Sequence, residues 1–286
     1  MSLHRKKWGY DIMKRKLFSE LSPLTYEISI KKNIFQRKLR DFLQQEQLAK
    51  TKKEELLPVS VYKHTSLIRR QLGNTDLTLQ ENKATNLSLA APKVSNILIK
   101  PNETFSFWYL VGTCSSSKGY KDGVTIFNDA VRPGLGGGLC QFTNLIHWIV
   151  LHSTLEITEH HHHDGLDLFP DYGRKIPFGT GTSIVYNYLD YRFKNNTDHT
   201  YQLIISVSDT HLNGELRSDN EQAYSYHIRA EKEYFSKEEG QVFRNGQIFR
   251  KCIDKRTGNL VEKKLIKENH ARVLYDTAHL EIRESY

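Results

Sequence analysis

The chain has 286 residues, of which 38% are hydrophobic and 26% charged, an ordinary balance for a globular protein. Its formal net charge is +8, which favours anionic partners without choosing among nucleic acid, a membrane surface or an acidic polymer. No stretch reaches the roughly 18 consecutive apolar residues that span a bilayer, and the basic N-terminus lacks the apolar segment of a secretory signal. The three cysteines are widely spaced, which disfavours a disulfide framework and predicts a reducing, cytoplasmic location.

The spacing of apolar residues near the N-terminus predicts a basic helix over about residues 24–50. Its apolar residues recur near helical spacing: Ile28, Phe35, Leu39 and Phe42. Basic residues crowd the same stretch: Lys31, Lys32, Arg37, Lys38 and Arg40. Such a run is usually a solvated helix face, and the alternative is a weak anchor to an anionic membrane surface. Residues 51–60 are polar and rich in Lys and Glu, so they are expected to form a linker.

Residues 62–71 and 86–96 predict two further helical segments, although Pro92 would divide the second into two short pieces. A turn is expected at Pro101-Asn102, and a strand over residues 104–111. Beyond residue 180, apolar residues recur at every second position, which is the spacing of a strand.

Residues 183–193 and 200–208 therefore predict strands, joined by a hairpin turn at residues 195–198. Three Asn/Gly pairs mark further turns between strands: Asn213-Gly214, Asn245-Gly246 and Gly258-Asn259.

A glycine-rich loop is the most informative segment of the chain. Four glycines fall in the five positions from Gly134 to Gly138, shortly before Cys140. So many glycines are costly in backbone entropy, unless the backbone must take positive φ or approach another group closely. A helix follows, because its apolar residues fall at i, i+3, i+4 and i+7: Phe142, Leu145, Ile146 and Ile149. We therefore expect Cys140 at the N-terminus of a buried helix.

This position gives Cys140 the chemistry of a candidate nucleophile. A helix N-terminus stabilises negative charge, so the reactive thiolate is expected to be favoured there. The same backbone N–H groups could form an oxyanion hole for acyl transfer. The alternative is a small buried hydrophobic residue. A phosphate-binding loop fits less well, because Leu139 and Cys140 follow Gly138 where that motif has Lys and Ser or Thr.

A nucleophilic cysteine needs a base, usually a histidine that a third polar group orients. His147 lies seven residues beyond Cys140, about 10 Å along the helix axis, which is too far for a direct hydrogen bond. The run of four histidines at residues 160–163 is the better candidate. In an extended chain His161 and His163 share one face.

Asp190 is the candidate orienting group, because a carboxylate inside a strand needs a partner. That partner is either a histidine of the 160–163 run or Arg192. An exposed tract is the alternative for His160 and His162. Zinc is disfavoured, because adjacent histidines cannot all converge on one ion, and we expect neither a metal nor another cofactor.

The stretch from about residue 86 to 210 resembles the VanW family, which is named from a gene in vancomycin-resistance clusters. The matching segments are residues 100–107, 119–120, 133–141, 159–163, 173–174 and 189–197. Some exported members of this family are regarded as peptidoglycan transpeptidases that use the domain's cysteine. By position, the resemblance implies that Cys140 attacks a stem-peptide carbonyl and that His163 or His161 moves the proton. It also gives Arg174 the role of binding a substrate carboxylate, and the alternative is an arginine on the surface or one that stabilises a turn. The substrate would lie against Gly136, Gly137, Gly138 and Gln141.

We expect an α+β fold in which the helix beginning at Cys140 packs on an antiparallel sheet, a layout like that of papain and transglutaminase. The expected domains are a basic helical arm and linker over residues 1–60, a core over residues 61–215, and a hairpin-rich extension over residues 216–286.

The expected function is cysteine-dependent acyl transfer, as a transpeptidase or amidase, on peptidoglycan or its precursor peptides. The alternative is a non-catalytic module that binds a wall precursor or glycopeptide in an aromatic groove with Phe107, Trp108 and Tyr120. Nucleic acid ranks last as a partner, because the basic residues are scattered along the chain.

Overall fold

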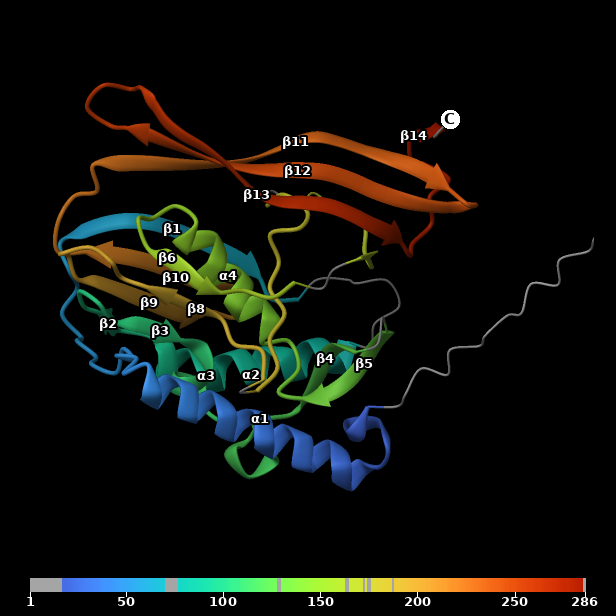
Figure 1. Ribbon diagram of the computed structural model, residues 1–286, viewed down its shortest axis with the longest axis horizontal. Coiled ribbons are helices and arrows are strands. Elements are labelled where there is room, and N and C mark those ends of the chain that lie inside the picture. The colour runs from blue at the N-terminus through green and yellow to red at the C-terminus, as the bar shows by residue number, and fades with distance from the viewer. Residues whose placement is uncertain are drawn as a thin grey trace, which may run out of the picture. The chain divides into compact units, whose positions relative to one another are not determined.

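The computed structural model describes residues 17–69, 77–127, 130–162, 165–171, 173, 176–186 and 188–284. The chain divides into two compact units, residues 1–45 and 46–286. The second unit combines helices with several sheets whose neighbouring strands are mostly antiparallel (Figure 1). The predicted α+β class is therefore confirmed.

Helix α1 (Pro23–Leu43) is the main element of the first unit, which also holds a short 3₁₀ turn, η1 (Phe18–Glu20). A capping box starts α1, because the Ser22 side chain accepts a hydrogen bond from the backbone of Thr25, whose own side chain accepts one from the Ser22 N–H. The predicted basic helix is confirmed, but it ends at Leu43, well before residue 50.

A four-stranded antiparallel sheet forms the centre of the second unit, in the order β1 (Val59–Leu67), β10 (His211–Ser218), β9 (Tyr201–Val207), β2 (Ile97–Ile99). Strand β9 confirms the strand predicted at residues 200–208. The helix predicted over residues 62–71 is wrong, because the side chains of β1 alternate between more and less exposed positions along its pairing with β10.

Residues 46–58 follow the edge of this sheet. The Leu98 N–H donates to the carbonyl of Thr51, the Lys53 N–H donates to the carbonyl of Asn96, and Leu57 is buried. The segment that was expected to be a linker because of its polarity is therefore hydrogen-bonded to the sheet of the second unit.

Helix α2 (Leu77–Val94) contacts β9, and helix α4 (Cys140–Val150) contacts β10 and β1. Pro92 does not divide α2, contrary to expectation, because it lies in the last turn, where it removes a single helical hydrogen bond. Two short strands, β4 (Asp122–Phe127) and β5 (Ala130–Leu135), pair beside α2 and lead to α4.

A three-stranded sheet has the order β3 (Thr104–Ser106), β8 (Arg192–Lys194), β6 (Glu156–Glu159). The chain turns into α3 (Phe107–Val111) where a continuous strand was expected, because the Ser106 side chain caps that helix. The turn at residues 195–198 makes no hairpin, since β8 and β9 belong to different sheets.

The C-terminal sheet consists of three long antiparallel strands, β11 (Tyr224–Glu238), β12 (Gln241–Asp254) and β13 (Leu260–Val273), as Figure 1 shows. Short parallel strands flank it, β14 (Ile282–Glu284) beside β11 and β7 (Leu166–Asp167) beside β13.

Only one of the three predicted Asn/Gly turns is confirmed, at Gly258 between β12 and β13. Gly246 lies inside β12 and Gly214 inside β10. A Cβ on Gly214 would stand 2.6 Å from the Ile149 Cδ1 atom, so this glycine makes room for α4 on the sheet. Packing, and not a turn, therefore explains Gly214.

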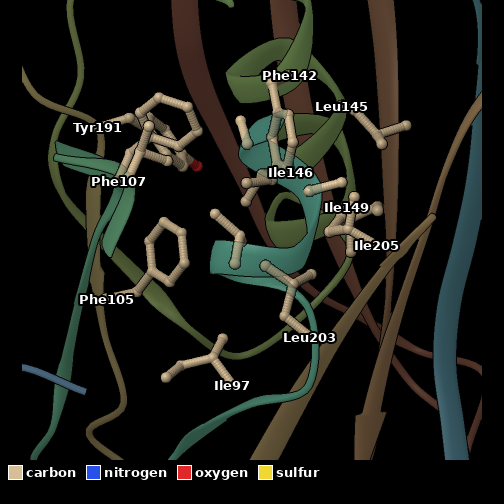
Figure 2. Close-up of a cluster of buried hydrophobic side chains, with 14 of the residues drawn as sticks. Ile97, Phe105, Phe107, Phe142, Leu145, Ile146, Ile149, Tyr191, Leu203 and Ile205 are labelled. Carbon is tan, nitrogen blue, oxygen red and sulfur yellow. The ribbon is translucent and has the colours of Figure 1, made fainter. Parts of the chain in front are cut away.

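Helix α4 contributes buried side chains to the core, beside those of α2 and of the neighbouring strands (Figure 2). Its side chains Phe142, Leu145, Ile146 and Ile149 are at most 1% exposed, as the helical periodicity predicts. Phe105 and Phe193 stack at 4.6 Å between ring centroids. Within the described residues, no helix combines the length and the apolar character required to cross a bilayer.

Candidate functional site

The glycine loop is shaped by close packing as well as by backbone conformation. Gly136 and Gly138 have φ angles of +74° and +91°, where glycine is favoured. A Cβ on Gly137 would stand 2.3 Å from the Gly123 carbonyl group, and one on Gly138 would stand 2.1 Å from the Lys83 Cγ atom. Positive φ or close approach therefore accounts for Gly136, Gly137 and Gly138, and these glycines lie tightly against β4 and α2.

Asn86 on α2 holds this loop in place. Its Nδ2 atom donates to the carbonyls of Gly137 and Lys121, each at 2.9 Å, and its Oδ1 atom accepts the Lys121 N–H at 2.9 Å. Asn86 is fully buried, so this amide replaces solvent as the loop's hydrogen-bonding partner. The loop therefore reaches the start of α4 in a fixed position.

Cys140 is the first residue of α4 and is half-buried. Burial raises the pKa of its thiol, and a backbone contact with Ile184 opposes that shift more weakly. The helix N-terminus was expected to favour the thiolate, whereas burial of the thiol disfavours this anion.

The first backbone donors of α4 are already engaged. The Gln141 and Phe142 N–H groups donate to the carbonyls of Gly138 and Leu139, each at 3.0 Å. The Gln141 side chain donates to the Ser66 Oγ atom and the Leu67 carbonyl, both at 2.8 Å, which joins α4 to β1. In this conformation Gln141 positions the helix that carries Cys140.

Thr182 packs on the first turn of α4. Its N–H donates to the Asn144 Oδ1 atom at 2.6 Å, and its hydroxyl lies 2.8 Å from the same atom and 3.4 Å from the Cys140 carbonyl oxygen. Thr143 also donates to that carbonyl, at 3.2 Å. Thr182 is buried, so the segment around it covers the start of α4.

Three histidine rings lie together at the middle of α4. The His147 ring is 4.0 Å from the His160 ring, which in turn is 4.0 Å from the His162 ring. The His147 Nδ1 atom lies 3.1 Å from the Tyr191 hydroxyl. Burial, and then the neighbouring histidines, holds the pKa of His147 well below its usual value, so this ring is neutral.

This cluster is connected to Cys140 through the segment that covers it. The His160 Nε2 atom lies 3.0 Å from the Gly181 carbonyl, and the Ser183 N–H donates to the His161 carbonyl at 2.7 Å. Residues 160–162 thus run beside residues 181–183, which include Thr182.

His161 points away from the cluster, as alternation along an extended chain predicts. Its Nε2 atom lies 3.0 Å from the Glu159 Oε1 atom. The same oxygen accepts the Asp190 N–H at 2.8 Å. Glu159 therefore stands where an orienting carboxylate would be needed for His161.

Asp190 is fully buried, and its carboxylate accepts four hydrogen bonds. The donors are the Trp108 N–H, the Tyr191 N–H, the Ser106 hydroxyl and the Arg192 Nε–H, at 3.0, 2.9, 2.5 and 2.8 Å. Two donors reach each oxygen, which fills the capacity of a carboxylate. Of the two roles considered for Asp190, the structure shows the pairing with Arg192.

Cys114 lies on the other side of the glycine loop, where a Cβ on Gly136 would stand 2.8 Å from its Cβ atom. Burial raises the pKa of the Cys114 thiol, and the Lys93 ammonium opposes that shift. Lys93 donates to the Tyr120 hydroxyl at 3.3 Å, and burial raises the pKa of Tyr120 to about 12. One cysteine therefore lies beside Gly136 and another follows the loop in the chain, so a thiol-specific test must separate the two.

Comparison with known proteins places these features in a family. A family model described as "VanW like protein" matches residues 82–217, which include the glycine loop, Cys140 and Asp190. Over 227 residues the chain is 31% identical to the Vancomycin B-type resistance protein VanW of Enterococcus faecalis (strain ATCC 700802 / V583), covering 79% of this chain and 82% of that protein. The chain belongs to the VanW family.

A second relative of this VanW-family chain is the "Uncharacterized protein YoaR" of Bacillus subtilis (strain 168). The two are 30% identical over 118 residues, which is 40% of this chain and 36% of that protein. No solved structure matches the chain. The papain-like layout is therefore still a prediction.

Two of the predicted site residues of this VanW domain, His163 and Arg174, lie outside the described residues. Phe107, Trp108 and Tyr120 are at most 6% exposed, so the aromatic groove expected of a binding module is wrong for these three residues. Four contributors were missed: Asn86, His147, Glu159 and Thr182. An Asn and a Thr carry no distinctive spacing, and His147 was set aside because only its distance from Cys140 along the helix was considered.

Proposed function

We propose that this VanW-family protein catalyses cysteine-dependent acyl transfer on peptides of the peptidoglycan type, with Cys140 as the nucleophile. The observation that carries the proposal is the placement of Cys140 at the start of a buried helix. The packed glycine loop fixes this residue from one side, and Thr182 with Asn144 fixes it from the other. A nucleophile held on rigid elements keeps a constant geometry towards a bound carbonyl.

In this proposal the Cys140 sulfur attacks a carbonyl carbon of a donor stem peptide. The thiol proton passes to a base and then to the departing amine, which leaves a thioester on Cys140. An amine of a second peptide, or water, attacks the thioester and restores the thiol. The first acceptor gives transpeptidation, and the second gives hydrolysis of the amide.

The base is proposed to come from the 160–163 histidine run. His161 has the orienting partner that a general base requires, because Glu159 contacts its Nε2 atom at 3.0 Å. His163 is kept as the other candidate, and Arg174 as the ligand of a substrate carboxylate. Gly136, Gly137, Gly138 and Gln141 are proposed to border the bound peptide.

The raised pKa of Cys140 sets a condition on this mechanism. A protonated thiol is a weak nucleophile, so the proton must leave in concert with attack or after the substrate has changed the site. Thr182 covers the first turn of α4 and the Ile184 backbone contacts the thiol, so displacement of this segment by substrate is the proposed step that brings Cys140 to the peptide.

The name of the Enterococcus relative supplies the biological setting, since it calls that protein a vancomycin B-type resistance protein. We propose a corresponding link to glycopeptide resistance for this chain. An enzyme that remodels stem peptides would change the targets to which a glycopeptide binds.

Trapping of the acyl-enzyme on the full chain tests the proposal. We expect a synthetic stem peptide to add an acyl group to Cys140, detected by intact mass and peptide mapping. Cys140→Ala should abolish the adduct, whereas Cys114→Ala, which changes the other cysteine of the loop, should retain it. His161→Ala and His163→Ala should identify the base by slowing adduct formation at least about 100-fold in one variant only.

A second candidate is a non-catalytic module that binds a wall precursor. The raised pKa of the Cys140 thiol and the engaged N–H groups of Gln141 and Phe142 favour it. This candidate predicts that the same peptide binds equally well to the wild-type and Cys140→Ala proteins and forms no adduct, a result that would exclude acyl transfer.

A further inference from the structure

Helix α1 carries an apolar stripe that is exposed along its whole length. Five side chains form it, and we call them the α1 stripe: Leu24, Ile28, Phe35, Leu39 and Phe42. At 3.6 residues per turn they fall within an arc of about 60°. Their exposed fractions run from 43% for Leu39 to 78% for Phe42. Large apolar side chains are seldom concentrated this way on a soluble surface, so the stripe indicates a docking face.

Basic residues border the α1 stripe on both sides. Lys31 and Lys38 project along one edge and Lys32 along the other, and all three are exposed. Over Pro23–Leu43 five basic residues stand against two acidic ones. An apolar face edged with lysines is the pattern of a helix that lies in the headgroup region of an anionic bilayer. There the stripe contacts acyl chains while the lysine stems extend to the lipid phosphates.

A second copy of the chain fits this surface less well. Ile28, Phe35 and Phe42 recur every seven residues, as in one row of a coiled-coil seam. The second row would hold Lys31 and Lys38 if it lies three positions further along, or Lys32 and Leu39 if it lies four positions further along. Pairing two stripes would bury these lysines and bring like charges together, whereas an anionic membrane would neutralise them.

The helix does not depend on the membrane to begin. Its capping box at Ser22 and Thr25 satisfies the first backbone donors locally, and Pro23 occupies the first helical position, where its missing N–H costs nothing. The stripe is therefore already presented on a formed helix, which reduces the ordering cost of binding.

We infer that α1 docks this protein on anionic membrane surfaces by inserting the α1 stripe among lipid chains, with Lys31, Lys32 and Lys38 on the lipid phosphates. Membrane docking through α1 is independent of the chemistry proposed for Cys140. The proposed partner is a bilayer that contains acidic phospholipids.

The test is co-sedimentation of the full chain with vesicles of phosphatidylcholine alone or mixed with phosphatidylglycerol. We expect the wild-type protein to bind the mixed vesicles and to dissociate as salt is added. The double variant Phe35→Gln/Phe42→Gln should lose at least about tenfold in affinity. Lys31→Gln/Lys38→Gln should lose the preference for phosphatidylglycerol and the salt dependence.

Tyr26→Gln is the matched control, because Tyr26 is an exposed aromatic residue on the opposite side of the same helix, 44% exposed. Tyr26→Gln should bind vesicles like the wild type. All variants should keep the circular dichroism spectrum of the wild type. Failure of the wild type to sediment with the mixed vesicles overturns the inference. The inference is also overturned if sedimentation velocity shows a dimer that depends on Phe35 and Phe42 while no vesicles are bound. The stripe would then be a contact with a second copy of the chain.

Discussion

Helices α1 and α4 both repeat apolar side chains at helical spacing, but the two stripes meet different surroundings. Phe142 and Ile146 on α4 are fully buried, whereas Phe35 and Phe42 on α1 are 66% and 78% exposed. The sheet beneath α4 is shaped to receive it, since Gly214 on β10 leaves space for Ile149. Periodicity thus specifies which face of a helix is apolar, and a complementary surface decides whether that face is buried.

The two helices also begin by different means. The start of α1 is local, because Ser22 and Thr25 cap each other's backbone. Helix α4 has no side-chain cap at Leu139, and its start depends on a loop held by Asn86. A residue at the start of α4, Cys140 above all, is therefore positioned by distant parts of the chain.

The largest expected effect comes from a matched pair of truncations. Phe142→Ala removes a fully buried ring, so the free energy of unfolding should fall by about 3–5 kcal/mol. Phe42→Ala removes an exposed ring and should change it by no more than about 0.5 kcal/mol. Urea unfolding measures both. Similar losses for the two variants would show that the α1 stripe is buried in solution, contrary to the comparison.

A smaller effect should follow from filling the glycine loop. A methyl group on Gly137 would clash with the backbone of Gly123, so Gly137→Ala should lower the free energy of unfolding by about 1–3 kcal/mol. Gly181→Ala is the control, because its Cβ would stand 3.8 Å from the Asn144 Oδ1 atom, an ordinary contact.

The rate of Cys140 alkylation in the Cys114→Ser/Cys252→Ser background reports on the position of this thiol, and it should change in Gly137→Ala. An unchanged rate and stability in Gly137→Ala would mean that the loop does not position Cys140.

The smallest effect is a pH dependence at the far end of α4. His152 donates to the Trp148 carbonyl at 2.8 Å and stacks on Tyr62, and burial lowers the pKa of His152 to about 4. Because the folded pKa lies below the unfolded value of about 6.5, this contribution to stability is present above pH 6.5 and is lost as the pH falls towards 4. At pH 5.5 the loss should be about 1 kcal/mol.

Urea midpoints at pH 7 and pH 5.5 measure this dependence. His152→Gln should reduce it without abolishing it, since the pKa of His147 is lowered in the same direction. An identical pH dependence in the variant and the wild type would show that His152 is free to take up a proton in the folded state.

The parts of the fold that could be predicted are those in which one segment carries its own signal. The helices α1 and α4, the strand β9 and the turn at Gly258 were predicted from periodicity and turn residues. The prediction of a helix at residues 62–71 failed because the half-buried pattern of β1 arises only from its pairing with β10. Gly214 was predicted to be a turn because its actual role, making room for Ile149, involves a partner 65 residues away in the chain.

The candidate site also contains residues that the sequence could predict and residues that it could not. The glycines and Cys140 stood out because their order in the chain is itself informative. The sequence left the partner of Asp190 open between Arg192 and a histidine, and it did not indicate Glu159. The contacts of both carboxylates with Arg192, and of Glu159 with His161, depend on how β6 and β8 pair.

The sequence by itself determined that a helix starts at Cys140 after a glycine-rich loop, since turn residues and helical periodicity are local properties. The tertiary structure alone decided that burial raises the pKa of this thiol and that residues 181–184 cover it. It also brought the His147, His160 and His162 rings together. Desolvation and contacts between distant segments exist only once the chain has folded, so no local pattern records them.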